Sequence, residues 1–237
     1  MKGDVKAILF DLDGTLLDNN MAEMVPFYLR LLSARVAHII PPKEFAAHLM
    51  RATDAMAAND GRATNETVFA EAFYPLTGHP RAELEPIFMD FYLRDFAALR
   101  QFTRRRHEAR DVVAQAFAQG YDVVIATNPF FPAIAIQQRL AWAGVDDFPY
   151  RLVTTYENSH FCKPNLGYFE EIAAYLGHAP EACLVVGDEE LDMVAARLGC
   201  PTFLVPSPAT ALGPDVPEPT YRGELTEVAT LLTVLRS

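Results

Sequence analysis

Two aspartates near the N-terminus, Asp11 and Asp13, are spaced so that their carboxylates can act together. They follow the apolar run Val5–Phe10, which predicts a buried strand. In extended backbone residues i and i+2 share a face, so both carboxylates point one way while Leu12 points toward the core. Two carboxylates this close repel each other unless a cation or a proton lies between them. Oxygen ligands of this kind suit Mg²⁺. A bare pair of this spacing is also typical of an ordinary turn.

A second acidic pair, Asp188 and Asp192, follows the predicted strand Cys183–Val186. A helix that begins here places residues i and i+4 on one side, where both could face the first pair. The alternative is helix capping by Asp188, with the acidic residues behind it favourable at a helix N-terminus.

Three further polar residues could bind an anion. Thr127 ends the predicted strand Asp122–Ala126, and its hydroxyl can donate to a phosphate oxygen. Asn128 follows and is held extended by the proline after it. Lys163 also precedes a proline and could supply a point charge. Each residue alone is typical of loops, but all of them fall at strand ends or loops of one predicted sheet.

Strands and helices alternate after residue 107, which predicts an α/β fold with a parallel sheet covered by helices on both faces. The expected strands are Asp122–Ala126, Tyr150–Thr154, Cys183–Val186 and Thr202–Val205. The expected helices are Glu108–Ala118, Phe131–Ala143, Leu166–Leu176, Leu191–Leu198 and Leu225–Leu235. Five prolines between Pro206 and Pro219 predict an irregular loop.

The chain between the first strand and this alternating region has helical apolar spacing instead. The expected helices there are Met21–His38, Lys43–Ala58, Thr64–Tyr74 and Arg81–Leu99. We therefore expect a Rossmann-like parallel-sheet core, residues 1–18 and 101–237, with an inserted all-helical domain, residues 19–100. The run Arg104–Arg106, where the chain returns to the core, predicts a solvated linker or a helix start.

Composition narrows the function classes. The 237 residues carry a net charge of −11, which speaks against nucleic acid and against an anionic membrane as partners. Three cysteines without a CxxC pair indicate neither a disulfide framework nor a zinc site. The apolar run near the N-terminus is too short for a signal peptide, and no stretch is long enough to span a membrane. We expect a cytoplasmic protein; the oligomeric state stays open.

Taken in order, these motifs resemble the haloacid dehalogenase (HAD) superfamily, in particular its phosphatases with a helical cap. The matching residues are Asp11-Leu12-Asp13-Gly14-Thr15-Leu16, Thr127, Lys163-Pro164 and Gly187-Asp188 with Asp192. The resemblance covers nearly the whole chain. It implies Mg²⁺-dependent hydrolysis of a small phosphorylated metabolite, with the insertion as a mobile cap over the site.

The resemblance also implies residue roles. Asp11 would be the nucleophile that forms an aspartyl-phosphate, and Asp13 the general acid. The candidate metal residues are Asp11, Asp13 through its backbone carbonyl, Asp188 and Asp192. For Asp192, a role in orienting Lys163 or the metal shell is favoured over direct contact with the metal. The candidate phosphoryl-binding residues are Thr127, Asn128 and Lys163, of which Thr127 and Lys163 would also stabilise the transition state.

Alternatives within and outside this chemistry remain. A phosphomutase of sugar phosphates uses the same aspartyl-phosphate. The dehalogenase branch lacks the second acid and needs no metal, so Asp13 and Asp188 speak against it. A phosphonate-cleaving enzyme would need a cap lysine, and Lys43 is the only lysine in the helical block. A non-catalytic binding protein on the same fold is a further alternative.

Overall fold

The fold is described from a computed structural model, in which residues 4–207 and 210–236 are placed. Its main sheet has six strands, all paired in parallel, in the order β5-β4-β1-β6-β7-β8. The strands are β1 (Ala7–Phe10), β4 (Asp122–Ile125), β5 (Leu152–Val153), β6 (Cys183–Gly187), β7 (Thr202–Leu204) and β8 (Tyr221–Arg222). The central strand β1 is fully buried, as its continuous apolar sequence requires in a sheet covered on both faces.

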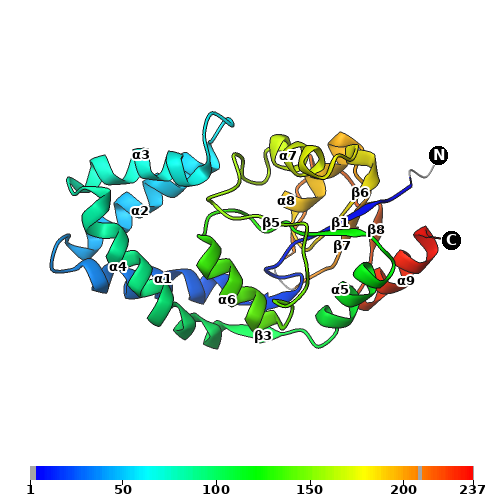
Figure 1. The fold of residues 1–237 in the computed structure, drawn as a ribbon, viewed down its shortest axis with the longest axis horizontal. Helices are drawn as coiled ribbons and strands as arrows, with labels where there is room; N and C mark the ends of the chain where they lie inside the picture. Colours follow the sequence, from blue (N-terminus) through cyan, green and yellow to red (C-terminus); the bar gives the residue numbers. More distant parts are fainter. Residues whose placement is uncertain (1–3, 208–209, 237) are drawn as a thin grey trace.

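Helices cover both faces of this sheet (Figure 1). Ile8 and Phe10 pack on the face shared with α5 (Ala109–Ala118), α6 (Ala133–Ala143) and α9 (Leu225–Leu235). The intervening residues of β1 pack on the opposite face, against α7 (Leu166–Leu176). Two short elements follow β6: α8 (Glu190–Met193) and a 3₁₀ helix, Val194–Leu198. The expected three-layer α/β core is therefore present, and the carboxyl ends of β1, β4 and β6 lie side by side.

The inserted helices lie to one side of the core (Figure 1). They are α1 (Met21–Val36), α2 (Pro42–Ala57), α3 (Asn65–Thr77), α4 (Arg81–Arg94) and the 3₁₀ helix Phe96–Phe102. An antiparallel pair of short strands, β2 (Leu17–Asn19) and β3 (Thr103–Arg105), carries the chain into and out of this block. We call β2 and β3 the hinge strands and the helical block the cap.

Several sequence-based expectations about local structure were wrong. The run Arg104–Arg106 is neither a linker nor a helix start, because most of it forms β3. Arg104 Nη2 and Arg106 Nε lie 2.7 and 2.6 Å from the carboxylate of Asp18 on β2. The expected helix Leu191–Leu198 is mostly 3₁₀, and the expected strand Tyr150–Thr154 shortens to β5. Strand β8 was not expected.

Among residues 4–207 and 210–236, no helix has the length and apolar character needed to cross a bilayer.

Candidate active site

The turn after β1 places the first acidic pair. Asp11 donates its backbone N–H to Val186 O at 2.8 Å, so the chain stays beside β6 for one residue past β1. Gly14 then turns with a φ of +81°, and its N–H binds Leu17 O at 2.8 Å. A Cβ at Gly14 would lie 2.1 Å from Oδ2 of Asp188, so only glycine leaves room for that carboxylate.

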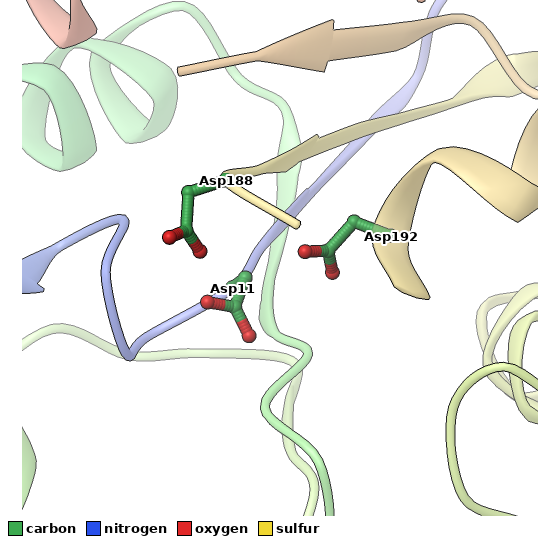
Figure 2. Close-up of side chains that lie close together, drawn as sticks. All are labelled: Asp11, Asp188 and Asp192. Atoms are coloured by element: carbon green, nitrogen blue, oxygen red, sulfur yellow. The ribbon is translucent and has the colours of Figure 1, made fainter. Parts of the chain in front are cut away.

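Three buried carboxylates converge beyond the sheet edge (Figure 2). Asp11 comes from the end of β1, Asp188 from the end of β6 and Asp192 from α8; one oxygen of each lies within 4.8 Å of the other two. Burial, and then the charges of Asp11 and Asp192, raise the pKa of Asp188 to about 7. Oxygen donors under mutual repulsion are the set that a hard divalent cation stabilises, so these residues fit Mg²⁺.

Lys163 lies against two of these carboxylates. Its Nζ is 2.8 Å from Oδ1 of Asp11 and 2.5 Å from Oδ1 of Asp192. Burial opposes the charged form of Lys163, but the two carboxylates outweigh burial and raise the pKa of the ammonium group above its ordinary value. The lysine therefore stays protonated, and its contact with Asp192 fits an orienting role for that aspartate. Direct contact between Asp192 and a metal stays a prediction.

The remaining expected residues border the same space. The backbone carbonyl of Thr127 accepts hydrogen bonds from Tyr168 and Thr154 at 2.9 and 2.7 Å, which fixes the residue just past β4. Asn128 Oδ1 accepts from the backbone N–H of Lys163 at 3.2 Å. A cavity of about 790 Å³ joins all seven predicted site residues: Asp11, Asp13, Thr127, Asn128, Lys163, Asp188 and Asp192.

The carboxylate of Asp13 has its own partners and is not one of the three that converge. Asn19 Nδ2 donates to Asp13 Oδ1 at 2.6 Å, and Nη2 of Arg139 on α6 forms an ion pair with Oδ2. Sequence reasoning missed Arg139. The signal was its place at i+3 from Ile136, on the apolar face of α6, where an arginine needs a buried partner.

The hinge region and both ends of the cap supply a large part of the remaining cavity wall, as expected for a cap over the site. These lining residues are Asp18, Asn19, Asn20, Met21, Ala22, Glu23, Gln101, Phe102, Thr103, Arg104 and Arg106. A ligand on the carboxylates would therefore contact the two strands on which the cap is mounted.

A family model for haloacid dehalogenase-like hydrolases matches residues 5–199 of the chain. The chain belongs to this family. No curated protein sequence matches the chain.

Solved structures of the superfamily have the same fold over nearly the whole length. A HAD phosphatase from Thermococcus onnurineus is 17% identical, with a TM-score of 0.60 over 96% of this chain and 98% of that one. The L-2-haloacid dehalogenase from Xanthobacter autotrophicus with chloropropionic acid covalently bound is 16% identical, with a TM-score of 0.59 over 97% and 98%. A predicted phosphoglycolate phosphatase from Haemophilus somnus is 17% identical, with a TM-score of 0.57 over 98% and 99%. Because phosphatases and dehalogenases both occur among these structures, the fold alone does not choose between the two reactions.

Proposed function

We propose that this HAD hydrolase is a Mg²⁺-dependent phosphatase of small phosphomonoesters. The observation that carries the proposal is a pair of acids near Asp11. Asp13 lies on the same turn after β1, and Asp188 lies at the end of the neighbouring strand β6. A halide leaves as a stable anion and needs no proton, whereas an alkoxide needs one. A phosphate dianion also needs a counter-charge before it can approach a carboxylate.

The first half-reaction forms a phosphoenzyme on Asp11. A carboxylate oxygen of Asp11 attacks the phosphorus, and the bond from phosphorus to the ester oxygen breaks. Asp13 gives its proton to that departing oxygen, so an alcohol leaves and Asp13 becomes a carboxylate. Lys163 and the hydroxyl of Thr127 hold the phosphoryl oxygens in line. Asp11, Asp188 and the backbone carbonyl of Asp13 would hold Mg²⁺, which neutralises part of the phosphoryl charge.

The second half-reaction regenerates the enzyme. Asp13, now a carboxylate, takes a proton from a water molecule as that water attacks the phosphorus of the aspartyl-phosphate. The bond between phosphorus and the Asp11 oxygen breaks, inorganic phosphate leaves, and Asp13 is protonated for the next turnover.

The test is phosphate release from a panel of phosphorylated metabolites and para-nitrophenyl phosphate, with Mg²⁺ and with excess chelator. We expect metal-dependent release that disappears in Asp11→Asn, because an amide is not a nucleophile of this kind. Circular dichroism checks that the variant is folded. Chloride release from L-2-chloropropionate without phosphate release would replace the proposal with dehalogenation. An isomerised sugar phosphate without free phosphate would replace it with a mutase.

A further inference from the structure

Arg139 is a charged side chain deep in the core. It lies on α6, is 2% exposed, and its guanidinium carbon sits 5.2 Å from the centre of the Phe131 ring. Its Nε has no hydrogen-bond partner among the residues that the structure describes. Burial lowers the pKa of Arg139 to about 10, so the group is still charged at neutral pH. A buried guanidinium with an unpaired N–H lowers the stability of the fold, so packing alone does not explain an arginine at this position.

The charged partner of Arg139 is Asp13. Asp13 lines the cavity with a side chain 19% exposed, whereas Arg139 lies behind the cavity wall. The other carboxylate oxygen of Asp13 accepts from Asn19, which belongs to the hinge strand β2. Asp13 is therefore held on two sides, by a core helix and by the base of the cap.

This arrangement leaves Asp13 able to act on a ligand. A carboxylate oxygen has two lone pairs, and each oxygen of Asp13 uses one of them on Arg139 or on Asn19. The second lone pair of each remains available. Without the two donors, rotation about the side-chain bonds would let the carboxylate turn toward other positive groups that line the cavity, such as Lys163.

We propose that Arg139 is a positioning residue for Asp13. Its guanidinium, together with the amide of Asn19, holds the Asp13 carboxyl group at the cavity wall, so that the free lone pair of one of its oxygens can carry the proton for the oxygen that departs from phosphorus. The inference rests on the proposed phosphatase activity and extends it to a residue outside the cavity.

The experiment compares two substrates of similar shape, phenyl phosphate and para-nitrophenyl phosphate. Nitrophenolate departs with little help from an acid, whereas phenolate needs a proton. The measured quantity is kcat/KM, which reports the steps up to departure of the leaving group. In Arg139→Met we expect a loss of about 100-fold for phenyl phosphate and less than about 10-fold for para-nitrophenyl phosphate. Arg139→Lys should recover part of the difference, because lysine keeps the charge without the planar fork.

Two further variants separate positioning from folding. Asn19→Ala removes the second donor at a half-buried site, and we expect the same unequal loss on a smaller scale. Leu140→Ala removes a buried apolar side chain from the same helix, and we expect it to change both substrates by one common factor. If Arg139→Met does not fold, Arg139→Lys and Asn19→Ala decide the question.

Equal losses for the two substrates in folded Arg139 and Asn19 variants would overturn the positioning role and leave the phosphatase proposal standing. A wild-type protein that releases no phosphate from either substrate would overturn both proposals.

Discussion

Asp188 carries part of the electrostatic cost of the site, which it shares with Asp192, because the pKa of each carboxyl group is raised. Its pKa in the folded protein is about 7, against an ordinary value of 3.8. The folded state thus binds this proton more tightly than the unfolded chain does. The stabilising contribution is complete below the unfolded value and is lost as the pH rises through about 7. At about 1.4 kcal/mol per pKa unit, the full loss is at most about 4 kcal/mol.

We therefore predict that, in chelator, Asp188→Asn becomes more stable relative to wild type as the pH is raised from 5 to 8. Asparagine keeps the size of the side chain and removes its charge. The free energy of unfolding from urea titrations measures the difference. Mg²⁺ should stabilise wild type more at pH 8 than at pH 5 and should have little effect on the variant. Parallel pH profiles of the two proteins would contradict the prediction.

Residue spacing predicted most of the polar groups at the site but not their partners. Asp11, Asp188 and Lys163 each follow or precede a recognisable strand or proline, and the parallel sheet brings such positions to one edge. Arg139 and Asn19 contact Asp13 from elements that are distant in sequence or too short to recognise. Their partners depend on how α6 and β2 pack, which local pattern does not encode.

At the scale of elements, the cap contacts the core beyond the hinge, both at α6, where Gln138 Nε2 donates to Tyr92 O at 2.7 Å, and at the start of α3. The first N–H groups of α3, those of Asn65 and Glu66, donate to Ser159 O and Tyr156 O at 2.8 Å each. The Asn65 side chain donates to Phe161 O at 3.3 Å and lies 3.4 Å from Cys162 Sγ. Helix-terminal donors need partners, and here the loop that leads to Lys163 provides them.

We predict that Asn65→Ala loosens this contact. Losing the buried amide's hydrogen bonds should cost about 1 kcal/mol or more and speed hydrogen exchange at the amides of residues 65 and 66 by about fivefold or more. Exchange measured by NMR checks this, with the amides of β4 as an internal reference. Thr64→Ala is the matched control, because the Thr64 side chain caps the same helix through Thr67 and its hydrogen bonds stay within the cap. Equal exchange in the two variants would show that Asn65 does not fasten the cap.

Helices and short apolar strands were predictable from the sequence, and the short polar strands were not. Helices α7 and α9 begin and end where apolar spacing and flanking residues indicated. The hinge strands β2 and β3 have three residues each, mostly polar, and their pairing is stabilised by the ion pairs of Asp18 rather than by apolar alternation. Such strands leave no periodic signal. The two strands lie on either side of the cap in the sequence, so their pairing is a long-range contact that local sequence does not indicate.

At the scale of the whole molecule, the reactive groups lie in a cavity bounded by core, hinge and cap. Its volume of about 790 Å³ is in the range of small-molecule sites. The cap is tied down at the hinge strands and again at Asn65, so a large substrate would have to displace it. The net charge of −11 adds a general repulsion toward acidic partners.

We predict that free phosphotyrosine is a much better substrate than the same residue in a folded phosphoprotein. We expect kcat/KM for free phosphotyrosine to exceed that for the folded phosphoprotein by about 100-fold or more. This ratio corresponds to a free-energy cost of about 3 kcal/mol for displacing the cap. A short unstructured phosphotyrosine peptide is the control for charge and chain length, and it should fall between the two. Asn65→Ala should reduce this difference in kcat/KM, because it weakens one of the attachments between cap and core while leaving the cavity residues unchanged. Equal rates on the free amino acid and the folded phosphoprotein would mean that the cap does not limit access to the reactive groups.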